Sequence, residues 1–66
     1  MNQKALTKAD EVIKLLEHLR REVEETKGYL QKNDATTAIR NQSDSNDELR
    51  TLMQKWGEFA QAIVGN

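Results

Sequence analysis

Residues 5–30 read ALTKADEVIKLLEHLRREVEETKGYL, and apolar side chains recur in this stretch at alternating spacings of four and three. Such spacing places one row of apolar residues along a helix, with the period of a coiled coil. The row contains Ala5, Ala9, Val12, Leu16, Leu19, Val23 and Leu30, with Thr26 as its one polar member. Thr7 and Asp10 resemble an N-terminal cap, and Asn2 is an alternative start. We therefore predict a helix from about residue 4 to about residue 32.

The dipeptide Asn33-Asp34 is the best candidate for a turn, because Asn tolerates the left-handed conformation and Asp is a preferred N-cap. Beyond it the four-three spacing resumes at positions 35, 39, 42, 46, 49, 53, 56, 60 and 63. Two interpretations remain open. One is a long helix over residues 35–64 with a weak middle at 41–47, and the other is a loop followed by a helix over 45–64 that begins with a Ser45–Glu48 capping box. The unbroken spacing favours the long helix, ended by Gly65.

Two helices joined by a short turn must lie antiparallel, so the sequence predicts an all-α helical hairpin forming a single domain over residues 1–66. A turn between residues 33 and 34 pairs positions whose numbers sum to about 67. The predicted core between the helices contains Val12, Leu16, Leu19, Val23, Leu30, Ile39, Leu49, Met53, Trp56 and Ile63.

Six large apolar residues flank this predicted core: Leu6, Ile13, Leu15, Leu52, Phe59 and Val64. A lone hairpin cannot cover both sides of such wide stripes, and exposed apolar patches normally mark an interface. We expect these six residues to contact a partner or a second copy, most simply in an antiparallel four-helix bundle. A homodimer is the expected state, with another protein as an additional or alternative partner.

Composition and charge narrow the class of protein. The 10 basic and 11 acidic residues leave a net charge of −1, whereas nucleic-acid binders usually carry a basic excess. The only basic cluster, around Arg20 and Arg21, is interleaved with glutamates. The chain has no cysteine and no apolar run longer than three residues, so we expect a cytoplasmic protein with no membrane segment.

No group of residues in the sequence predicts catalysis. His18 and Glu22 are spaced i,i+4 and offer two metal ligands, but a site needs three or four, so we interpret them as a solvated pair on the outer face. Glu22, Glu24 and Glu25 form an acidic cluster with nothing apolar around it to raise a pKa. We expect no enzyme activity, no cofactor, no metal and no small-molecule substrate.

The favoured function is a non-enzymatic interaction module: a small regulator, adaptor or chaperone that binds a partner protein through its helix faces. Two alternatives are a nucleic-acid-binding regulatory bundle and a structural subunit of a phage or secretion-type assembly. In size and expected shape the chain resembles the helical-hairpin co-chaperones of type III secretion and the plasmid copy-number regulators that bind RNA loops, and no motif residue carries over from either group.

Overall fold

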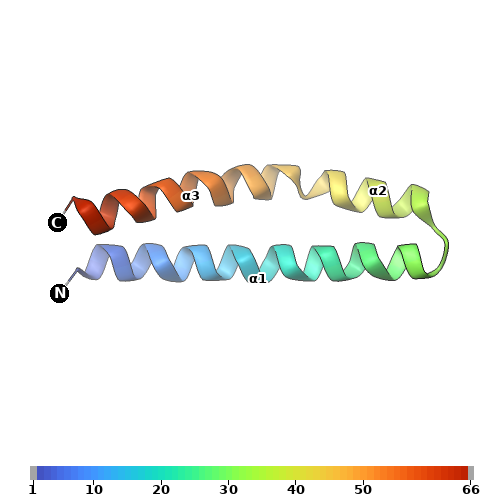
Figure 1. Cartoon of the computed structure of the whole chain (residues 1–66), viewed down its shortest axis with the longest axis horizontal. Coiled ribbons are helices and arrows are strands. Elements are labelled where there is room, and N and C mark those ends of the chain that lie inside the picture. Colours follow the sequence, from blue (N-terminus) through green and yellow to red (C-terminus); the bar gives the residue numbers. More distant parts are fainter. Residues whose placement is uncertain (1, 66) are drawn as a thin grey trace.

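The computed structural model describes residues 2–65 and folds them into a hairpin of helices (Figure 1). Helix α1 spans Gln3–Gln31, α2 spans Ala35–Asp44 and α3 spans Asn46–Val64. Helices α2 and α3 follow one another along a second limb that runs antiparallel to α1. The predicted all-α class is therefore confirmed, and residues 2–65 contain no strand.

The helices begin at capping side chains that lie close to the predicted ends. Asn2 rather than Thr7 caps α1: its side-chain oxygen accepts the Ala5 N–H at 3.0 Å, while its amide donates to the Ala62 carbonyl at 2.6 Å. At the other end of the hairpin, Asn33 adopts a left-handed conformation with φ 60°. Asp34 then caps α2 by accepting the Thr37 N–H at 3.1 Å. The turn predicted at Asn33-Asp34 is thus confirmed, together with the conformation of each residue.

The second limb is helical almost throughout but is interrupted at Ser45. The Ser45 N–H bonds the Gln42 carbonyl three residues back, and four-residue bonding resumes where the Leu49 N–H reaches the Ser45 carbonyl at 3.0 Å. The predicted Ser45–Glu48 capping box is wrong, because the Ser45 hydroxyl donates to the Asn41 carbonyl instead. Asp47 and Glu48 still place negative charge in the first turn of α3, where the helix dipole favours it. The observed limb thus lies between the two predicted alternatives.

The register of the hairpin is close to the predicted one. Three side-chain pairs cross between the limbs: the ion pairs Lys8–Glu58 and Glu11–Lys55, and the contact of His18 with Glu48. Each pair of numbers sums to 66. Nearer the turn, the Asn41 amide donates to the Thr26 hydroxyl at 2.9 Å and to the Glu22 carbonyl at 3.2 Å. The predicted sum of about 67 is correct to within one residue for these side-chain pairs.

The face that each helix turns inward differs from the predicted core. The row between the limbs contains Ala5, Lys8, Val12, Leu15, Leu19, Glu22, Thr26 and Tyr29 from α1, and Ala38, Asn41, Ser45, Glu48, Leu52, Lys55, Phe59 and Ala62 from the second limb. Every one of these side chains is buried or half-buried. On the second limb the row lies one residue before the predicted row throughout, which amounts to a rotation of about 100°. Only Val12 and Leu19 of the predicted core lie in it.

Short and charged side chains make this arrangement possible. Ala5, Ala38 and Ala62 let the backbones approach closely, and polar residues in the row find partners across the hairpin. In the predicted rotation these polar groups would lie at the edges without those partners. The result is a thin core, since the buried apolar residues among 2–65 are Ala5, Val12, Ala38 and Ala62.

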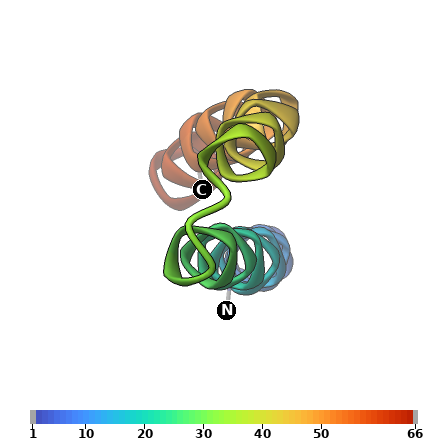
Figure 2. The same cartoon turned by 90° about the vertical axis from the view of Figure 1, so that its right-hand side faces the viewer.

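The molecule is a narrow rod of 49 × 16 × 10 Å. Its radius of gyration is 15.3 Å, against about 11 Å expected for a compact chain of this length. Viewed from the turn, the two limbs slant in opposite directions and therefore cross rather than lie in strict parallel (Figure 2). None of the helices described over residues 2–65 carries an apolar stretch long enough to cross a membrane.

Candidate functional site

The most extensive feature of the surface is a face of large apolar side chains, which we call the apolar face. Its residues are 48–84% exposed in the single chain. They are Leu6, Ile13, Leu16, Val23 and Leu30 from α1, and Ile39, Leu49, Met53, Trp56, Ile63 and Val64 from the second limb. In an antiparallel pair, the positions following the inward row on both helices lie on the same side, so the two limbs contribute to one continuous surface.

Much of the predicted division between core and interface is therefore reversed. Eight residues predicted as core lie on the apolar face: Leu16, Val23, Leu30, Ile39, Leu49, Met53, Trp56 and Ile63. Of the six residues predicted to contact a partner, Leu6, Ile13 and Val64 are exposed as expected, whereas Leu15, Leu52 and Phe59 are half-buried in the row between the limbs. The cause is the rotation of the helices, because the charged positions at 8, 22, 48 and 55 turn inward.

Two hollows indent the apolar face. One, of about 260 Å³, lies beside the Ser45 break and is lined by Leu19, Val23 and Leu49 together with polar groups of Gln42 and Asn46. The other, of about 540 Å³, lies near the chain ends between Leu6, Phe59 and Ile63. Such hollows between two helices have the form that accepts side chains from another helix.

Trp56 lies on the same face, between these two hollows along the limb. Its ring is 59% exposed and packs edge-on against Phe59, with 6.2 Å between ring centroids. Tryptophan is enriched among the residues that dominate binding energies at protein interfaces. Because Trp56 is exposed, any partner that covers the apolar face would also cover this side chain.

The opposite edge of the hairpin is charged. Near the chain ends, Lys8 and Lys55 face Glu11 and Glu58, with the shortest contact 2.9 Å between Lys8 Nζ and Glu58 Oε1. The hydrogen bond from Lys8 lowers the pKa of Glu58, and the same bond raises the pKa of Lys8. Two cations and two anions thus balance one another in this layer.

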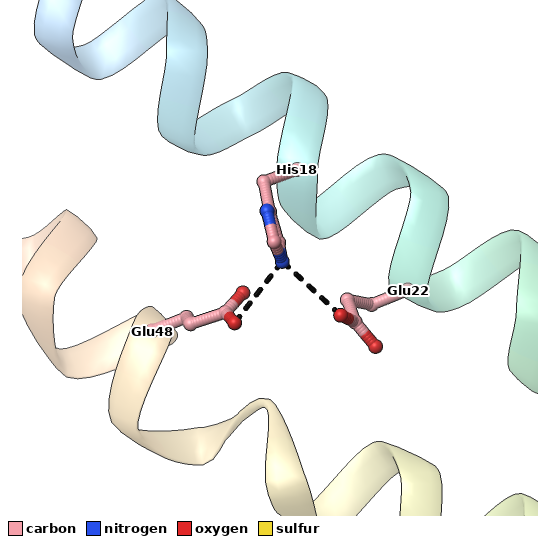
Figure 3. A group of neighbouring side chains, drawn as sticks. All are labelled: His18, Glu22 and Glu48. Carbon is pink, nitrogen blue, oxygen red and sulfur yellow. Dashed lines mark hydrogen bonds and ion pairs between the residues drawn. The ribbon is translucent and has the colours of Figure 1, made fainter.

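A second charged group lies further along the hairpin, where His18 meets two glutamates (Figure 3). His18 Nε2 lies 3.1 Å from Glu22 Oε1 on the same helix and 3.1 Å from Glu48 Oε1 on α3. The imidazole is half exposed, whereas Glu22 retains 23% and Glu48 35% of side-chain exposure. His18 therefore does not lie on the outer face as predicted but bridges the two limbs.

The basic cluster around Arg20 and Arg21 lies among acidic side chains. Arg20 Nε pairs with Glu24 Oε1 at 2.9 Å, and Glu17, Arg20, Arg21 and Glu24 share one shallow surface depression. Of the acidic cluster noted in the sequence, Glu24 and Glu25 are exposed, whereas Glu22 is half-buried in the row between the limbs. Alternating charges of this kind weaken the attraction to phosphate that non-specific nucleic-acid binding needs.

The sequence analysis did not identify Glu48 as a neighbour of His18. The predicted register nevertheless places position 18 opposite position 49, since the paired numbers sum to about 67. Glu48 was instead assigned to a capping box with Ser45. The inward position of Asn41 was also missed, because the predicted row passed through Gln42.

Comparison of the chain with known protein families, characterised proteins and solved structures finds no match.

Proposed function

We propose that the protein is a non-enzymatic interaction module whose apolar face is covered by a second copy of the chain, forming a four-helix bundle. The single observation that carries the proposal is the burial pattern. The hairpin buries mainly alanines and one valine, while eleven larger apolar side chains stay at least 48% exposed. Soluble monomers rarely leave so much contiguous apolar surface in water.

The solvent-accessible surface area of the chain supports a partner as large as a second hairpin. The chain exposes 5250 Å², whereas a folded monomer of 7.6 kDa exposes about 4,300 Å² on average. The excess is about 950 Å², close to the roughly 800 Å² per partner that a stable interface buries. A second hairpin of equal length presents a matching face along the whole rod, which favours a copy of this chain as the occupant.

Analytical ultracentrifugation of the full chain tests the proposal. We expect a species of twice the 7.6 kDa chain mass to form as the chain concentration is raised to about 1 mM. Met53→Glu places a charge at a side chain that is 69% exposed in the middle of the face. This variant should sediment as a monomer with its helical circular dichroism retained, because the Met53 side chain contributes little to the hairpin itself.

Thr51→Glu is the matched control, since it adds the same charge two residues away, on an exposed position that lies on the charged side of α3. It should remain dimeric. A wild-type chain that stays monomeric over the whole concentration range would overturn self-association. So would equal masses for the two variants.

A further inference from the structure

We propose that His18, Glu22 and Glu48 form a binding site for one zinc ion that joins α1 to α3. The nitrogen and oxygen atoms that these three residues offer lie within 4.8 Å of one another. Two of the residues lie one turn apart on α1, and the third lies in the first turn of α3. Figure 3 shows both carboxylates directed at the same edge of the imidazole.

Two of the three distances between ligand atoms fit a tetrahedral ion, and the two carboxylates offer oxygens within 4.8 Å of each other. Ligands bound at about 2.0–2.1 Å in tetrahedral geometry are separated by roughly 3.3 Å. His18 Nε2 lies 3.1 Å from an oxygen of each glutamate, so small side-chain adjustments would bring all three ligands onto one ion. Three protein ligands would leave the fourth position to water, as in zinc sites that remain open.

The charges at the site also favour a cation. In the Lys8–Glu58 layer two ammonium groups balance two carboxylates, but within residues 2–65 neither Glu22 nor Glu48 pairs with a lysine or arginine. A single Nε2 atom offers at most one N–H to two carboxylates. Glu48 Oε2 is buried and has no hydrogen-bond partner among the described residues. A divalent ion would supply the missing positive charge and a partner for the second carboxylate.

The ligand set favours zinc over the alkaline-earth ions. Mg²⁺ and Ca²⁺ prefer oxygen ligands alone, whereas zinc accepts imidazole and carboxylate together. The site also suits a single chain, because His18 lies two residues, or about 200° around the helix, from Leu16 on the apolar face. His18 therefore lies away from the apolar face, whereas Glu22 also lines the hollow beside Ser45. The zinc site is formed by one chain, so this inference does not rest on the proposed dimer.

Titration of the full chain against a chromophoric zinc chelator tests the site, together with thermal melts in zinc, in Mg²⁺ and in EDTA. We expect one zinc per chain and, at about 100 times the dissociation constant, a melting temperature raised by roughly 10 °C or more. Magnesium should give no comparable shift. His18→Gln and Glu48→Gln should each weaken zinc binding at least about tenfold, since even outer-shell changes have that effect.

Glu24→Gln is the matched control, because Glu24 is an exposed glutamate of α1 that pairs with Arg20. It should bind zinc like the wild type. Each variant is compared with its own EDTA melt, so a change in the stability of the metal-free hairpin does not affect the result. Equal zinc affinity in all three variants would overturn the site, and so would a stoichiometry of one zinc per two chains.

Discussion

At the scale of single residues, Asp34 does most to set the direction of the second limb. Its carboxylate accepts the Thr37 N–H directly after the left-handed Asn33, so that the turn and the start of α2 are defined by two adjacent side chains. Hydrogen bonding to Thr37, through its side chain and its backbone N–H, lowers the pKa of Asp34 below its ordinary value of 3.8. The cap is therefore strongest when the carboxyl group is ionised.

The stability of the hairpin should consequently depend on the protonation of Asp34. A carboxyl group whose pKa is lower in the folded chain contributes its full stabilisation above its unfolded pKa, here about 3.8, and loses it as the pH falls through the lower folded pKa. Asp34→Asn keeps a capping side chain but cannot titrate. In urea denaturation measured between neutral pH and pH about 2, the wild type should lose more stability than Asp34→Asn. Parallel pH profiles would contradict this assignment.

At the scale of the elements, we expect α2 to be the weakest part of the hairpin. It has 10 residues, and of its side chains only Ala38 is buried. The break at Ser45 interrupts its bonding to α3, and Asn41 provides its polar contacts with α1. Short helices draw most of their stability from tertiary contacts, so the two hydrogen bonds of Asn41 to α1 should contribute much of the stability of α2.

Replacing Asn41 should therefore destabilise α2 more than the small size of the Asn41 side chain suggests. Asn41→Ala removes two hydrogen bonds worth about 0.5–1.5 kcal/mol each. Ser43→Ala is the control, because it truncates an exposed polar side chain of the same helix. We expect Asn41→Ala to be less stable than this control by about 1–2 kcal/mol in chemical denaturation.

Hydrogen exchange locates the effect. Amides over residues 36–48 should exchange faster than those over 52–60 in the wild type, and Asn41→Ala should widen the difference. Uniform protection along the second limb would mean that α2 is as firmly packed as α3.

At the scale of the whole molecule, the hairpin has an unequal distribution of apolar groups. Its inward row combines alanines, one valine and a few half-buried larger apolar side chains with ion pairs, while eleven large apolar side chains lie outside. Because the buried apolar area is small, the stability of the single chain is expected to be low for its size. The proposed second copy would add the larger part of the core.

Folding and association should therefore be coupled. If the dimer is the stable form, its melting temperature rises with protein concentration, because association binds the folded state and not the unfolded chain. Circular dichroism melts over about a hundredfold range of concentration should show this rise. The monomeric variant Met53→Glu should melt at a lower and constant temperature, and a constant wild-type value would argue for a stable single chain.

The sequence by itself determined the helical class, the turn at Asn33-Asp34 and the antiparallel register, because capping chemistry and spacing along the chain are local properties. It did not determine the rotation of the helices. The apolar stripe is wider than one row, so two neighbouring rows satisfy the same four-three spacing. The choice between them depends on close backbone approach at Ala5, Ala38 and Ala62, and on pairing between residues far apart in sequence. The cluster of His18, Glu22 and Glu48 is a product of that rotation, which only the packed structure specifies.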